Sequence, residues 1–198
     1  MSKARHSSHV PILKLVLSAM FVAVGIVLPF FTGQIQRIGN MLLPMHLPVF
    51  LCGLICGWQY GAAIGFVLPI MRSLVFGMPY LYPNAVSMAV ELAVYGLVAG
   101  LIYSLLKKQN TLSVYAAMLP SMLLGRAAWG ITQIVLLGID GNVFTWQMFM
   151  AGAFLNAIPG IALQLVLIPA IISALHHTGI HRFKNAELGK ESGDGGTV

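Results

Sequence analysis

The chain has 198 residues, of which 58% are hydrophobic and 8% are charged, and it carries a formal net charge of +6. A typical soluble domain is about 45–50% apolar and about 25% charged. The composition therefore excludes a soluble globular protein, a disordered chain and a disulfide scaffold. Residues 15–36, 38–71 and 141–181 contain no Asp, Glu, Lys or Arg. These runs are continuously apolar and do not alternate, so they favour an all-α polytopic membrane protein over a β-barrel.

The apolar runs predict six transmembrane helices, which form one domain over residues 1–184. We place these helices at about 11–31, 41–57, 60–76, 84–106, 113–137 and 147–175. The second and third are short and are joined only by Trp58-Gln59-Tyr60. The first is expected to be an uncleaved helix, because its apolar stretch is long and no cleavage site follows it. Residues 185–198 are polar and Gly-rich, which predicts a disordered tail.

The basic residues predict the orientation of the bundle. With six spans, eight of the 11 Lys and Arg residues fall on the side of the termini, and only Arg37 falls in a loop on the opposite side. By the positive-inside rule both termini should be cytoplasmic. This distribution also explains the positive charge without a nucleic-acid partner. The outer loops are then about 32–40, 77–83 and 138–146, the last with the turn signature Asp140-Gly141-Asn142.

Three ionisable residues, Arg72, Glu91 and Arg126, lie inside predicted spans. Such residues are costly in a bilayer and usually face a cavity or a partner. Counting from the outer surface at ~1.5 Å per residue places them roughly 6, 10 and 16 Å deep. Other polar side chains fall in the same outer half, namely Asn84, Tyr95, Gln133 and Asn156. The set predicts a pocket that opens outward.

The two arginines and the glutamate sum to a charge of +1, which would suit a monoanion, since guanidinium groups bind carboxylates in bidentate geometry. The amide and hydroxyl side chains would then serve polar groups of the ligand. In the alternative interpretation, Glu91 pairs with one arginine and holds neighbouring helices together. That pairing would still leave the other arginine without a counter-charge.

The remaining motifs indicate packing and not chemistry. Glycines recur every fourth residue from Gly53 to Gly65 and again at Gly96 and Gly100; this spacing lets helices approach closely. Cys52 and Cys56 share one helix face, and His46 is the nearest other residue that could bind a metal. A metal site would need more ligands. We therefore expect the cysteines to pack in the core, with neither a metal nor a cofactor. No hydrolase or protease motif is present, so an enzyme is not expected.

Several segments together resemble one transporter family. These are residues 40–53 (NMLLPMHLPVFLCG), 69–73 (PIMRS), 76–79 (FGMP), 83–85 (PNA) and 91–96 (ELAVYG). With the Gly57, Gly61 and Gly65 series, they are similar to the substrate-binding subunits, or S-components, of energy-coupling factor (ECF) transporters. The resemblance covers residues 10–180 and is strongest to the pantothenate-type subunit.

The resemblance implies a membrane subunit that captures a vitamin on the outer side of a bacterial plasma membrane. It also implies partners, which are a transmembrane coupling subunit and two cytoplasmic ATPases. In the family the subunit is thought to topple in the membrane to deliver its ligand. Ala19 and Ala23 match the family's contact motif for the coupling subunit, and residues 32–40 and 77–83 correspond to the loops that cap the ligand.

Pantothenate, a carboxylate with an amide and two hydroxyls, fits the predicted charge of the pocket. Arg72 and Arg126 are the candidates for its carboxylate. Three other interpretations stay open at this point. The chain could bind another vitamin or precursor, such as pyridoxine, hydroxymethylpyrimidine or riboflavin. It could also be a stand-alone secondary transporter, which would predict internal repeats. It could finally be a structural membrane subunit, which would not need buried arginines.

Overall fold

The computed structural model describes residues 9–32, 43–106, 110–153 and 155–177, and every regular element in these ranges is helical. The elements in chain order are α1 (His9–Val27), η1 (Leu28–Thr32), α3 (His46–Cys56), α4 (Trp58–Phe76), η2 (Leu81–Ala85), α5 (Val86–Leu105), α6 (Thr111–Ile139), α7 (Trp146–Ala153), η3 (Leu155–Ala157) and α8 (Ile158–His177). Five helical segments are long and apolar enough to cross a membrane, and α3 is a shorter apolar helix. The predicted all-α membrane bundle is thus confirmed.

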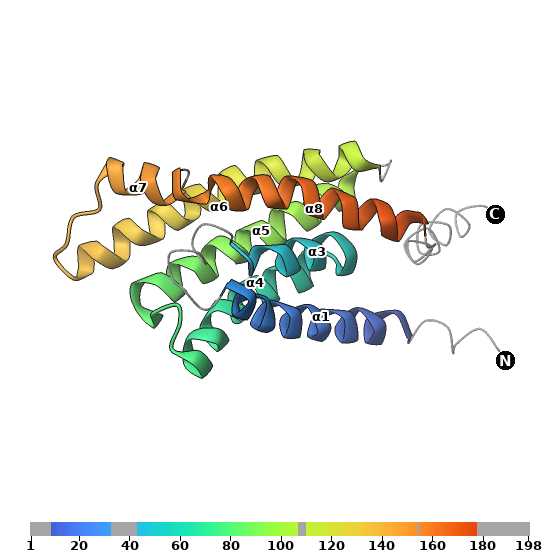
Figure 1. Ribbon diagram of the computed structural model, residues 1–198, viewed down its shortest axis with the longest axis horizontal. Coiled ribbons are helices and arrows are strands. Elements are labelled where there is room, and N and C mark those ends of the chain that lie inside the picture. Colours follow the sequence, from blue (N-terminus) through green and yellow to red (C-terminus); the bar gives the residue numbers. More distant parts are fainter. Residues whose placement is uncertain (1–8, 33–42, 107–109, 154, 178–198) are drawn as a thin grey trace, which may run out of the picture.

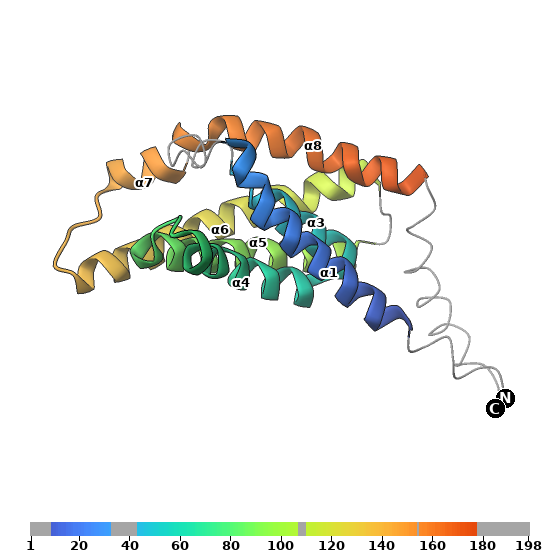
Figure 2. The ribbon, with the colours of Figure 1, turned by 60° about the horizontal axis from the view of Figure 1, so that its bottom comes forward.

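The long helices run roughly lengthwise through the bundle, and α1 crosses the others obliquely (Figures 1 and 2). Helix α1 begins and α8 ends at the same end of the bundle, whereas η2 and the α6–α7 connection lie at the opposite end. This arrangement agrees with an even number of crossings. Most of the basic residues that predict the cytoplasmic side, the loop 33–40 and the tail 185–198 lie outside the described residues.

Helix α3 is the centre of the fold. Every residue from His46 to Cys56 except Ile55 is buried, and the helix packs against α1, α4, α5 and α8. Its 11 residues extend about 16 Å at 1.5 Å per residue, roughly half the hydrocarbon thickness. The predicted start near residue 41 is wrong, because Leu43 has a φ of 50° and the helix begins only at His46.

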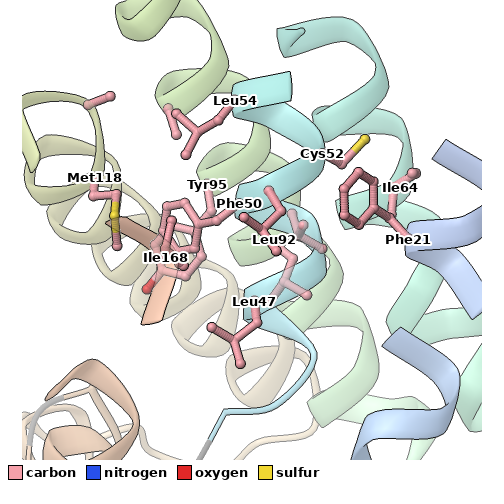
Figure 3. Close-up of a cluster of buried hydrophobic side chains, with 14 of the residues drawn as sticks. Phe21, Leu47, Phe50, Cys52, Leu54, Ile64, Leu92, Tyr95, Met118 and Ile168 are labelled. Carbon is pink, nitrogen blue, oxygen red and sulfur yellow. The ribbon is translucent and has the colours of Figure 1, made fainter. Parts of the chain in front are cut away.

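The core around α3 is one continuous apolar cluster (Figure 3). Phe50 of α3 stacks on Tyr95 of α5 with ring centroids 5.0 Å apart. Phe21 of α1 and Ile64 of α4 belong to the same cluster. The core therefore joins α1, α3, α4 and α5 into one body.

A glycine contact surface fixes α3, α4 and α5 at backbone distance. A Cβ added at Gly53 would lie 2.7 Å from the Gly96 carbonyl oxygen, and one at Gly96 would lie 2.2 Å from that of Gly61. The interpretation of the glycine repeats as packing motifs is confirmed. Gly57 alone forms the turn from α3 to α4, with a φ of 107° that favours glycine. The predicted connection at 58–60 is wrong, since these residues open α4.

The predicted sixth span, 147–175, is not one straight helix. It consists of α7, the short turn η3 and α8, with residue 154 outside the described residues. Pro159 suits the new start at Ile158, because proline has no amide hydrogen and is favoured in the first turn of a helix. The predicted turn at 140–142 is confirmed, as Gly141 has a φ of 72° and the Asn142 amide donates to the Leu137 carbonyl over 2.9 Å.

Candidate functional site

A buried ionic cluster surrounds Glu91 of α5. One carboxylate oxygen, Oε1, lies 2.8 Å from Arg126 Nη1 of α6 and accepts a hydrogen bond of 2.9 Å from the Tyr95 hydroxyl. His46 Nε2, at the first residue of α3, lies 3.7 Å from the same oxygen, which is too far for a hydrogen bond. All four side chains are at most 6% exposed. Three helices therefore meet at one carboxylate.

The cluster has more polar groups than the protein satisfies. Arg126 Nε and Nη2 and both ring nitrogens of His46 have no hydrogen-bond partner among the described residues. Buried polar groups normally have a partner, because an unpaired one costs about 1–3 kcal/mol. Nε and Nη2 form the side edge of the guanidinium, the edge that binds a carboxylate in bidentate geometry. The site thus presents an unused carboxylate-binding edge.

Polar contacts continue from the ionic cluster along the α5–α6 interface. Gln133 Nε2 donates to Ser87 Oγ over 3.1 Å, and Ser87 Oγ donates to the backbone carbonyl of Asn84 over 3.0 Å. Gln133 Oε1 is buried and unpartnered within the described part of the chain. Ser87, Glu91 and Tyr95 share one face of α5 by their spacing of four, and Asn84 lies just before this helix in η2. On α6, Arg126 and Gln133 contact this face through Glu91 and Ser87. We call this set of side chains along the α5–α6 interface the polar line.

Arg72 lies apart from this line. Its Nη1 donates to the Ile26 carbonyl of α1 over 2.7 Å, and its guanidinium carbon is 5.4 Å and 5.5 Å from the ring centroids of Phe30 and Phe76. Arg72 therefore stabilises the end of α1, where a cation is favourable. The predicted charge of +1 assumed that both arginines share one pocket. In the structure, Arg126 alone pairs with Glu91.

Asn156 also lies outside the buried cluster, because it is exposed in η3 between α7 and α8. An aromatic group joins α6, α7 and the segment between them. Trp129 contacts Phe144 and Phe149, and Phe149 stacks on Trp146 at 5.3 Å. A Cβ at Gly130 would meet the Phe149 ring at 2.5 Å. Phe149 therefore packs on α6 at Gly130, which lies between Arg126 and Gln133 in the sequence.

The comparison with protein families decides the identity of the chain. The family described as the ECF transporter, substrate-specific component, matches residues 13–172. The chain belongs to this family. Neither the comparison with curated proteins nor that with solved structures found a match. The protein is thus the substrate-specific membrane subunit of an ECF transporter, and its family is one of transporter components and not of enzymes.

In this ECF subunit three buried polar residues that the sequence did not assign to the site are His46, Ser87 and Gln164. His46 was considered only as a metal ligand, yet its ring faces the Glu91 cluster. Gln164 of α8 is 1% exposed, and its Nε2 finds no partner in the described ranges. A single glutamine in the apolar run 158–175 is the signal that could have identified it.

Helix α1 of the ECF subunit presents Ala19 and Ala23 on its exposed side, whereas Ser18 and Phe21 face the core. Cys52 is buried against α1, with its Sγ 3.6 Å from Ser18 Oγ. Among the described residues, no group of three potential metal ligands is brought together. The polar line between α5 and α6 is therefore the candidate ligand site.

Proposed function

We propose that this ECF substrate-specific component binds an anionic vitamin, pantothenate, on the outer side of the bacterial plasma membrane. The observation that carries the proposal is the free side edge of the buried Arg126 guanidinium. Because Glu91 occupies only Nη1, the remaining edge can bind the ligand carboxylate. Gln133, Gln164 and the outer residues Asn84 and Asn156 are candidates for its amide and hydroxyl groups.

The loaded subunit then delivers its ligand by toppling against a transmembrane coupling subunit driven by two ATPases. Two features support this part of the proposal. The surface is largely apolar on α1, α6 and α8, which suits a body that rotates in lipid. The exposed positions of Ala19 and Ala23 leave them available to a partner helix.

A neutral aromatic vitamin, such as pyridoxine or riboflavin, is the second candidate. Two observations favour it. Glu91 already compensates the charge of Arg126, and the aromatic group of Trp129, Phe144, Trp146 and Phe149 offers faces on which a flat ring can stack. Such a ligand would not need the free guanidinium edge.

Calorimetric titration of the purified subunit in detergent tests the proposal. Pantothenate is compared with pyridoxine, riboflavin, biotin and folate, and the variants are Arg126→Lys and Arg72→Lys. Lysine keeps the charge but cannot present a planar edge. A lost bidentate contact of about 1.5–3 kcal/mol predicts at least tenfold weaker pantothenate binding in Arg126→Lys.

Arg72→Lys is the matched control, because a lysine can still donate to the Ile26 carbonyl and the residue is outside the polar line. Equal losses in both variants would contradict the role of the Arg126 edge. Tight binding of a neutral vitamin alone would replace pantothenate with the second candidate. Binding of none of the five would overturn the proposed ligand class.

A further inference from the structure

His46 is the one titratable side chain of the cluster for which the protein provides no bond in the described residues. Its ring is fully buried and lies 5.3 Å from the Tyr95 ring, centroid to centroid. Glu91 Oε1 already accepts from Tyr95 and faces Arg126 at 2.8 Å, and His46 Nε2 stays at 3.7 Å. The imidazole therefore faces the cluster without taking part in its hydrogen bonds.

The packing of α3 and the backbone at its start hold His46 in place. It is the first residue of α3, whose other faces are packed against α1, α4 and α5. The His46 amide donates to the Leu43 carbonyl over 3.0 Å, which fixes the backbone at the start of the helix. A side chain held so firmly beside unpaired donors is preorganised for a ligand.

Arg126 Nη1 lies 2.8 Å and His46 Nε2 lies 3.7 Å from the same Glu91 oxygen. One small molecule beside this oxygen can therefore reach both side chains. A neutral imidazole has one donor and one acceptor, so it suits an amide or hydroxyl better than a second carboxylate. A ligand whose carboxylate binds Arg126 would bring to His46 the polar group a few bonds away. In pantothenate that group is the amide, two methylene carbons from the carboxylate.

We infer that His46 is a specificity-determining residue that hydrogen-bonds the amide next to the ligand carboxylate. The inference rests on the proposed carboxylate site at Arg126. It defines the substrate class as carboxylates with an amide two carbons away. Selectivity then follows from the two contacts together, since a molecule that lacks either group leaves buried donors or acceptors unpaired.

The test compares three ligands by calorimetric titration. These are pantothenate, its alcohol analogue without the carboxylate, and its analogue with a methylated amide nitrogen. Each is measured with the wild type, His46→Leu, His46→Gln and Arg126→Lys. His46→Leu is expected to bind pantothenate at least tenfold more weakly and to lose the preference for pantothenate over the N-methyl analogue. His46→Gln, which keeps a donor and an acceptor, should retain part of that preference.

Arg126→Lys should show the opposite pattern, with a reduced preference over the alcohol and a retained preference over the N-methyl analogue. Thermal unfolding without ligand separates binding from folding. His46→Leu should melt at or above the wild-type temperature, because it removes two unpaired buried nitrogens. Cys52→Ala is the control on the same helix, since Cys52 faces α1; its binding should equal that of the wild type.

Unchanged pantothenate affinity or unchanged analogue preference in His46→Leu would overturn the role of His46 and leave the proposed function in place. A lowered melting temperature with equal weakening for all three ligands would assign His46 a structural role and also overturn the inference. If the wild type binds no pantothenate, the proposed ligand fails, and the assignment of His46 to its amide fails with it.

Discussion

Glu91 holds together side chains from different helices, and its loss should therefore affect stability before it affects binding. It is 2% exposed and pairs with Arg126 across the α5–α6 interface. Removing one partner of a buried pair leaves the other charge uncompensated, at a cost of about 3–5 kcal/mol.

We expect Glu91→Gln to lower the unfolding temperature of the purified subunit markedly. The double variant Glu91→Gln/Arg126→Gln should recover part of the loss, because no isolated charge remains. Thermal unfolding in detergent measures both. An unfolding temperature equal to that of the wild type in the single variant would show that the pair contributes little to stability.

At the residue scale, the sequence predicts how far along a span a residue lies, but not the direction in which its side chain points. Counting along the spans predicts that Arg72 lies near the outer surface and Arg126 near the midplane. It could not show that Arg72 turns to the Ile26 carbonyl on α1 and that Arg126 turns to Glu91 on α5. The direction of a side chain around the helix axis depends on which neighbours pack against each face. A membrane helix that is apolar on most sides gives little periodic signal for this.

At the scale of elements, the glycine contacts make α3, α4 and α5 the least tolerant part of the molecule. A Cβ at Gly96 would lie 2.2 Å from the Gly61 carbonyl oxygen, a backbone atom that cannot move without its helix. Overpacking of this kind costs about 1–3 kcal/mol or more.

Gly96→Ala is expected to destabilise the subunit clearly, whereas Gly138→Ala should be neutral or slightly stabilising. An added Cβ at Gly138 meets nothing within 4 Å, and alanine favours the helix by up to about 1 kcal/mol over glycine. The unfolding temperatures of the two variants provide the comparison. Equal temperatures would contradict the close approach of α4 and α5.

The sequence indicated the glycine contacts but not the nature of α3. Its apolar run is continuous with the residues before it, and a short apolar run does not distinguish a buried helix from a membrane span. Leu43 and Pro44 shorten the helix locally, and its burial on all sides comes from α1, α4, α5 and α8, which no local pattern reveals.

At the scale of the whole molecule, the exposed side of α1 is separate from the candidate site on α5 and α6. Ala19 and Ala23 are exposed, and the neighbouring Val16 and Met20 are 60% and 50% exposed. Small side chains on an apolar face permit close contact with another helix. Ligand binding and association with the coupling subunit should therefore be separable by substitution.

We expect Ala19→Leu/Ala23→Leu to abolish co-purification with the coupling subunit and the ATPases, because the added side chains hold the partner helix away. Vitamin binding by the isolated subunit should be unchanged. Ala127→Leu, at an exposed alanine on α6, is the matched control and should assemble normally. Normal assembly of the α1 variant would place the contact elsewhere on the molecule.

The two faces of α5 have a consequence for how such subunits diversify. Leu92, Gly96 and Gly100 contact α3 and α4 through the backbone, whereas Ser87, Glu91 and Tyr95 carry the polar side chains. Substitutions on the polar face leave the glycine contacts between α3, α4 and α5 unchanged. A descendant lineage can therefore acquire a new nutrient preference while these backbone contacts still hold the three helices together.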